Sequence, residues 1–125
     1  MPYVGDMRSL VIKCTAGAED AERSNQAFTV AAAGIAAGAR VSLWLTGEAT
    51  WFAVPGKAEE FALPHAAPLA ETRDLVLAEG DLVVCTQCAA RRGITEADLV
   101  PGARIAGAAG FVELALAEDA QALVY

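Results

Sequence analysis

The sequence has few basic residues and no long apolar run, and each shortage excludes a class of protein. Nine lysine and arginine residues stand against 16 aspartate and glutamate residues, giving a net charge of −7. A protein that binds nucleic acid through its phosphates needs a basic surface, so we do not expect nucleic-acid binding. No apolar run approaches the ~20 residues of a membrane-spanning helix, so we expect no membrane span.

Two further shortages point to the cytoplasm. Residues 1–6 lack the basic start and apolar middle of a secretory signal. The chain has three cysteines, an odd number that does not suit a disulfide framework. In a reducing compartment we expect these cysteines to be either small buried side chains or reactive thiols.

What the sequence does have is apolar surface, most of it alanine. Of the 125 residues 55% are hydrophobic, and 29 are alanine. Because alanine buries little area, the core is expected to be thin for a chain of this composition. The length predicts a single domain over residues 1–125.

Apolar strand patterns alternate with helical patterns along the chain. We predict strands at 8–14, 41–45, 81–85, 103–107 and 120–125. Predicted helices lie at 19–37, 69–78, 86–92 and 111–117, with a helical turn at 95–98 and an irregular stretch at 48–68. Such alternation predicts βαβ units, hence an α/β fold: a three-layer α/β/α sandwich around a parallel sheet of about five strands.

The pattern with the clearest chemistry is Cys85-x-x-Cys88. Cys85 ends a buried strand, and Cys88 lies in the first turn of the next helix, where free N–H groups favour thiolate. We expect this effect to act more strongly on Cys88, and on Cys85 only if its side chain turns toward the same amides. Two cysteines buried as small hydrophobes are the alternative. The predicted site comprises Cys85 and Cys88 as catalytic thiols, supported by Thr86, Gln87, Arg91 and Arg92, with the arginines adding positive charge.

Two other residues are weaker candidates. Cys14 also ends a strand and is a candidate third thiol, although a core position suits it better. His65 lies in a loop between prolines, where a solvated side chain is expected. Together with Cys85 and Cys88 these residues would complete a zinc site, but a single CxxC with scattered partners is a weak zinc signal. We therefore predict no metal and no cofactor.

Three further patterns favour structural roles. The segment Gly107 to Gly110 joins a strand to a helix and suits a tight turn better than a phosphate cradle. Four bulky aromatic residues are expected in the core or a subunit contact rather than around a ligand: Trp44, Trp51, Phe52 and Phe61. The acidic residues Glu59, Glu60, Glu71 and Asp74 are expected on a solvated face.

The order of these motifs resembles the DsrE/DsrF-like family of small sulfur-relay proteins, often labelled predicted peroxiredoxins. The first strand runs into Thr15-Ala16-Gly17-Ala18-Glu19-Asp20, and an alanine-rich helix ends near Gly38. The second strand ends in Leu45-Thr46-Gly47-Glu48, and the third ends in a cysteine that precedes Arg92-Gly93. A closing helix with Val112-Glu113-Leu114 and a terminal strand follow.

The resemblance implies a sheet order of 4-3-2-1-5 and assembly as homotrimers or homohexamers. It also implies that a cysteine at the position of Cys85 carries a persulfide. In that strand order Cys14 would lie two strands from Cys85, roughly 10 Å away, which weakens the idea of a third thiol at the site.

Three functions stay open at this point. The first is a cytoplasmic sulfur carrier with sulfurtransferase-like activity, holding sulfane sulfur on Cys85 with Cys88 as its partner thiol. Its partners would be a sulfur-donor or acceptor protein, or a small thiol. The second is a peroxiredoxin-like redox protein that cycles a Cys85–Cys88 disulfide. The third is a non-catalytic oligomeric or metal-binding protein.

Overall fold

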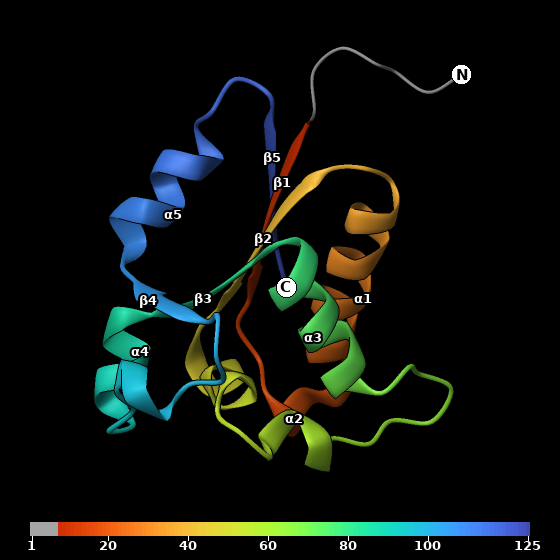
Figure 1. Cartoon of the computed structure of the whole chain (residues 1–125), viewed down its shortest axis with the longest axis vertical. Coiled ribbons are helices and arrows are strands. Elements are labelled where there is room, and N and C mark those ends of the chain that lie inside the picture. The colour runs from red at the N-terminus through yellow and green to blue at the C-terminus, as the bar shows by residue number, and fades with distance from the viewer. Residues whose placement is uncertain (1–7) are drawn as a thin grey trace.

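Strands and helices alternate along the whole described chain, residues 8–125 of the computed structural model (Figure 1). Residues 1–6, for which we predicted no secretory signal, lie outside that range. The strands are β1 Ser9–Cys14, β2 Arg40–Leu45, β3 Asp81–Cys85, β4 Arg104–Ala106 and β5 Ala120–Val124. The α-helices are α1 Ala21–Ala36, α2 Lys57–Glu60, α3 Leu69–Glu79, α4 Thr86–Arg91 and α5 Ala108–Ala115. Short 3-10 turns are η1 Ala18–Asp20, η2 Gly47–Ala53 and η3 Glu96–Asp98.

The five strands form one parallel sheet in the order β4-β3-β2-β1-β5. This confirms the predicted α/β class and the strand order that the family resemblance implied. Cys14 pairs with Leu45 of β2, and Leu45 pairs with Val84 of β3. The carboxyl ends of the three central strands therefore meet at one edge of the sheet.

Helices cover both faces of the sheet, and Figure 1 shows α1 and α3 on one side and α5 on the other. The face under α1 and α3 carries the larger core, which includes Ile12, Leu43 and Val84. The opposite face carries a small cluster of Val11, Trp44 and Val83, against which Phe111 of α5 packs. Trp44 and Phe111 meet edge to face, with ring centroids 5.5 Å apart. The core on this face is much smaller than the one under α1 and α3.

The last helix begins three residues before its predicted start. Gly107 caps α5, so the helix runs through Ala108 and Ala109, both strong helix formers. A Cβ on Gly110 would lie 3.2 Å from the Trp44 ring, so glycine allows α5 to approach the sheet closely. The glycine pair therefore serves as a tight turn with close packing, as predicted.

The irregular stretch at 48–68 contains η2, α2 and a loop that carries His65. His65 is exposed and has a positive φ of 63°, in keeping with its predicted loop position. The acidic residues of this region and α3 are exposed as expected, but Glu59 and Asp74 also ion-pair with the buried guanidinium of Arg73. Within residues 8–125 no helix is long and apolar enough to cross a membrane.

Candidate functional site

The candidate site lies at the carboxyl edge of the sheet, where β3 passes into α4 without a loop. Cys85 is the last residue of β3 and also caps α4 in an extended conformation. It is half-buried. Because side chains alternate along a strand, Cys85 lies on the same sheet face as Val83, the face that α5 covers. Cys88 follows in the first turn of α4 and is buried, with 8% of its surface exposed. Both thiols thus take the positions that the sequence predicted.

The surroundings of Cys85 favour its thiolate. Burial alone raises the pKa of this thiol. The amide of Cys88, the thiol of Cys88 and the amide of Gln87 all lower it, and so does the positive charge of Lys13. The sum holds the pKa of Cys85 below its ordinary value of 9.0. None of these contacts is a well-aligned capping hydrogen bond, so the effect is that of N–H and S–H dipoles facing the sulfur.

Cys88 links the candidate site to η2, the 3-10 turn that follows β2. The backbone N–H of Gly47 donates to Cys88 Sγ at 3.2 Å. The Cys88 thiol in turn faces Cys85 and favours negative charge there. The Gly47 amide, the Cys88 thiol and the Cys85 sulfur are therefore lined up in that order, which is an arrangement suited to nucleophilic sulfur chemistry at Cys85.

Cys14 is not part of this arrangement. It lies with Ile12 in the core under α1, on the opposite face of the sheet from Cys85, and none of its surface is exposed. Its thiol donates to the carbonyl of Ala16 at 3.2 Å. Burial raises the pKa of Cys14 from 9.0 to about 11, so it stays a thiol at neutral pH. Cys14 thus takes the core position that we favoured over a third reactive thiol.

The two predicted supporting arginines, Arg91 and Arg92, lie at the end of α4. Arg92 ion-pairs with Glu48 at 2.8 Å and donates to the carbonyl oxygen of Cys88 at 3.1 Å. It therefore connects α4 to η2 without contacting either sulfur through a hydrogen bond. Arg91 is exposed at the end of α4. The cation that favours the Cys85 thiolate is Lys13 of β1.

Thr86 and Gln87 are exposed at the start of α4. The Gln87 amide acts on Cys85, whereas the Thr86 hydroxyl lies beside Gly107, 3.7 Å from where a Cβ would be. The starts of α4 and α5 are therefore neighbours at this edge of the sheet. Their adjacency follows from the pairing of Cys85 with Ala106.

The zinc arrangement that we weighed does not form. Among residues 8–125 no three histidine, cysteine or acidic side chains come together as metal ligands would. Cys14 and Cys85 lie on opposite faces, and His65 stands in the loop between α2 and α3.

Sequence reasoning missed Lys13 and the Gly47 amide. Lys13 lies over the Phe111 ring, with its ammonium 4.2 Å from the centroid, on the same sheet face as Cys85. The signal was a lone lysine inside an otherwise apolar strand, which the two-residue alternation places on the face opposite Cys14. The Gly47 contact depends on loop geometry and left no such signal.

The chain belongs to the DsrE/DsrF-like family, whose family model matches residues 8–121. A comparison with curated proteins gives no match.

Several solved structures share the fold. YchN from E. coli is 18% identical, with a TM-score of 0.79, and the match covers 95% of this chain and 100% of that one. MTH1491 from Methanobacterium thermoautotrophicum, a protein of unknown function, is 12% identical, with a TM-score of 0.71 and coverage of 96% and 100%. At these identities the similarity concerns the fold.

Proposed function

We propose that this protein relays sulfane sulfur, holding it as a persulfide on Cys85 with Cys88 as the partner thiol. Membership of the DsrE/DsrF-like family suggests a small sulfur-relay type of protein. The observation that carries the finer proposal is the lowered pKa of a half-buried Cys85 whose sulfur faces the Cys88 thiol. Attack on sulfane sulfur requires such a thiolate.

In the loading step the Cys85 thiolate attacks the outer sulfur of a donor persulfide. A sulfur–sulfur bond forms to Cys85, the bond within the donor breaks, and the donor leaves as a thiolate. Cys85 then carries one extra sulfur as a persulfide, and no external oxidant is needed. The N–H and S–H groups that face Cys85 would also stabilise the charge of that persulfide.

Two release routes fit the pair of thiols. An acceptor thiolate can attack the outer sulfur, which restores the Cys85 thiolate. Alternatively Cys88 can attack Cys85 Sγ, which expels hydrosulfide and forms a Cys85–Cys88 disulfide. A small thiol or a protein thiol must then reduce that disulfide. The proposed reaction suits a reducing compartment such as the cytoplasm.

Mass spectrometry after exposure to glutathione persulfide tests the proposal. We expect the protein to gain about 32 Da, the mass of one sulfur atom, with the adduct mapped to Cys85. Cys85→Ser should abolish the adduct, and Cys14→Ser should keep it. If Cys85→Ser gains sulfur as readily as the parent protein, Cys85 is not the carrier.

A thiol redox function is the second candidate, because the same contact between Cys88 and Cys85 favours a disulfide. The two functions differ in their product. With hydrogen peroxide as the oxidant, a redox protein loses about 2 Da as the disulfide forms, and Cys88→Ser would instead stop at a sulfenic acid on Cys85. Turnover with peroxide and a thiol reductant, without persulfide loading, would favour this alternative.

We further propose that the protein is a homotrimer or homohexamer. The support is the family resemblance and a set of large apolar side chains exposed on α5, on the residue after it and on β5. Leu116 is 78% exposed and Val124 is 63% exposed, which is costly for a monomer. Light scattering should give a mass of three or six chains, and Leu116→Glu should lower it. A monomer mass at micromolar concentration would contradict this assembly.

A further inference from the structure

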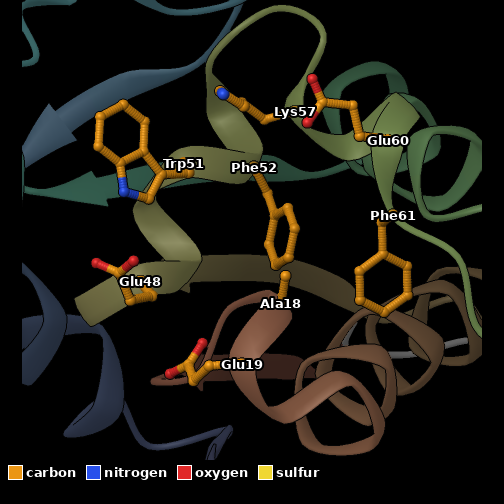
Figure 2. Close-up of a pocket in the computed structure, with 8 residues that line it drawn as sticks. All are labelled: Ala18, Glu19, Glu48, Trp51, Phe52, Lys57, Glu60 and Phe61. Atoms are coloured by element: carbon orange, nitrogen blue, oxygen red, sulfur yellow. The ribbon is translucent and has the colours of Figure 1, made fainter.

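A cavity with aromatic walls lies at the same edge of the sheet, and neither Cys85 nor Cys88 lines it. It has a volume of about 350 Å³ and opens between η1, η2 and α2. Figure 2 shows three rings around it, with the side chains from α2 on one side and Ala18 and Glu19 on the other. Its lining residues are Ala18, Glu19, Glu48, Trp51, Phe52, Lys57, Glu60 and Phe61.

The aromatic wall is held in place by the core. Phe52 is only 3% exposed and packs edge to face against Phe28, with ring centroids 5.7 Å apart. On its other side Phe61 makes the same type of contact at 5.6 Å. Because Phe52 is fixed by rings on two sides, this wall of the cavity is already formed before anything binds.

The charged residues around the rings are mostly acidic. Glu19, Glu48 and Glu60 line the cavity, against one lysine. Glu48 forms an ion pair with Arg92, and the Glu19 carboxylate accepts a hydrogen bond from the backbone N–H of Gly17 at 2.7 Å. Glu60 has no ion-pair or hydrogen-bond partner among residues 8–125. One carboxylate is therefore left to interact with a bound molecule.

The lysine shows which chemistry the rings accept. The ammonium of Lys57 lies over the Trp51 ring, 5.9 Å from its centroid. A cation is attracted to the negative face of an aromatic ring, and tryptophan is the most favourable of the three aromatic side chains. Lys57 thus acts as an internal occupant of the Trp51 face, held there by a flexible chain that a ligand can displace.

We propose that this cavity binds a small organic ammonium cation with an apolar body. The apolar part would contact Phe52 and Phe61, and the cationic part would lie between Trp51 and the Glu60 carboxylate in place of Lys57. Neutral and anionic molecules of the same shape lack this second interaction. The site goes beyond the proposed sulfur relay and does not require it.

Choline is a suitable probe, with 3,3-dimethylbutan-1-ol as its neutral counterpart of the same shape. The chain has two tryptophans, and their indole N–H signals are resolved in a ¹H–¹⁵N NMR spectrum. We expect choline to shift the Trp51 signal with saturation, while the neutral alcohol shifts it much less. Trp44 is 2% exposed, and its indole N–H donates a hydrogen bond to the Ser42 hydroxyl. Its signal is therefore the internal control and should not move.

Two substitutions should change choline affinity in opposite directions. Lys57→Met removes the internal cation but keeps an apolar chain, so choline should bind ~2–5-fold tighter. Glu60→Gln removes the unpaired carboxylate, so choline should bind ~2–5-fold more weakly. Glu79→Gln, at the exposed end of α3 on the amino edge of the sheet, has the same loss of charge away from the cavity and should leave affinity unchanged.

Three results would overturn the proposal. The first is equal shifts of Trp51 by choline and by the neutral alcohol, or no shift by either. The second is a Glu60→Gln variant that binds choline as Glu79→Gln does. The third is Lys57→Met binding choline no more tightly than the parent protein. Each variant changes an exposed side chain, so loss of folding does not confuse the outcome.

Discussion

Cys14 and Cys85 end parallel strands at the same edge of one sheet, yet their surroundings are opposite. After β3 the helix α4 begins at the next residue, so N–H groups face Cys85. After β1 the residues Thr15, Ala16 and Gly17 come before η1, and the Ala16 carbonyl accepts the Cys14 thiol. One sulfur therefore meets donors and the other meets an acceptor.

A position at the end of a strand does not by itself make a cysteine reactive. Cys14 is fully buried under α1, and its pKa rises to about 11. Cys85 is also partly desolvated, but the dipoles of α4 and the charge of Lys13 outweigh that effect. What distinguishes the two thiols is how soon a helix follows the strand and which face of the sheet the side chain takes.

The largest expected difference is in the rate of alkylation at neutral pH. With a pKa near 11, Cys14 has only ~1% of the thiolate of an ordinary cysteine, and burial slows it further. We therefore expect Cys85 to react with iodoacetamide more than ~100-fold faster than Cys14 in the folded protein. Timed labelling followed by peptide mass spectrometry measures both rates in one sample.

Unfolding provides the control for that comparison. In urea the contacts that separate the two thiols are lost, so both should be labelled at similar rates. A gap that persists in urea would mean that local sequence, and not the fold, sets the reactivity. A folded protein in which Cys14 reacts as fast as Cys85 would contradict the core position of Cys14.

Stability at alkaline pH gives the next largest effect. The unfolded chain ionises Cys14 near its ordinary value of 9.0, whereas the folded chain holds it as a thiol to about 11. Stability from this group is thus complete below pH 9 and falls as the pH rises toward 11, by about 2–3 kcal/mol. Urea unfolding at several pH values should show this loss in the parent protein but not in Cys14→Ala.

Other groups also titrate in this range, so the difference between variants is the quantity that matters. Cys85 has a lowered pKa and acts in the opposite sense, but it is present in both proteins and cancels. Cys88→Ala should keep the alkaline loss of the parent. If Cys14→Ala shows the same loss of stability between pH 9 and 11, burial does not hold Cys14 protonated.

Much of this arrangement was predictable from sequence because it depends on strand and helix patterns. The β3 run into Cys85 and the following helix placed both candidate thiols correctly, since a βαβ unit brings strand ends to one edge. The strand order needed the family resemblance, because local patterns do not say which strands are neighbours. The start of α5 was misplaced because Gly107 caps the helix directly and leaves no loop.

What the sequence did not reveal depends on tertiary contacts. Arg91 and Arg92 are near Cys88 in sequence, but Arg92 turns to Glu48 and the Cys88 carbonyl. Lys13 is 72 positions from Cys85 in the sequence. It acts on Cys85 only because both side chains lie on the same face of the sheet. The positions of the two tryptophans also depend on tertiary contacts. Trp44 lies in the core as expected, whereas Trp51 borders a cavity.

A smaller effect is expected when the partner thiol is removed. Cys88→Ala takes away both the S–H dipole and the acceptor of the Gly47 amide, so the pKa of Cys85 should rise. Alkylation of Cys85 at pH 7 should slow by about 3–10-fold. Greater nucleophilicity of the more basic thiolate offsets part of that loss. The rate of Cys85 alkylation, measured as a function of pH in variants that lack Cys14, gives the change in the pKa of Cys85.

Cys88→Ser is the matched variant, because a hydroxyl keeps a donor at nearly the same place. It should retain much of the effect on Cys85 that Cys88→Ala loses. If the two variants give the same rate profile as the parent, the Cys88 thiol contributes nothing to the charge on Cys85. The contrast with Cys14 would then depend on the amides and Lys13 alone.

The smallest expected effect separates the two sources of positive charge at the site. Lys13→Met keeps the apolar chain over Phe111 but removes the ammonium, so the pKa of Cys85 should rise. Alkylation at pH 7 should slow by ~2–3-fold at low salt and less in 0.5 M salt, because salt screens a partly exposed charge. Arg91→Ala removes a positive charge of the same sign from the end of α4, where it is exposed. If Arg91→Ala slows alkylation as much as Lys13→Met does, the net charge of this edge acts on Cys85, and the sheet face that Lys13 shares with it does not matter.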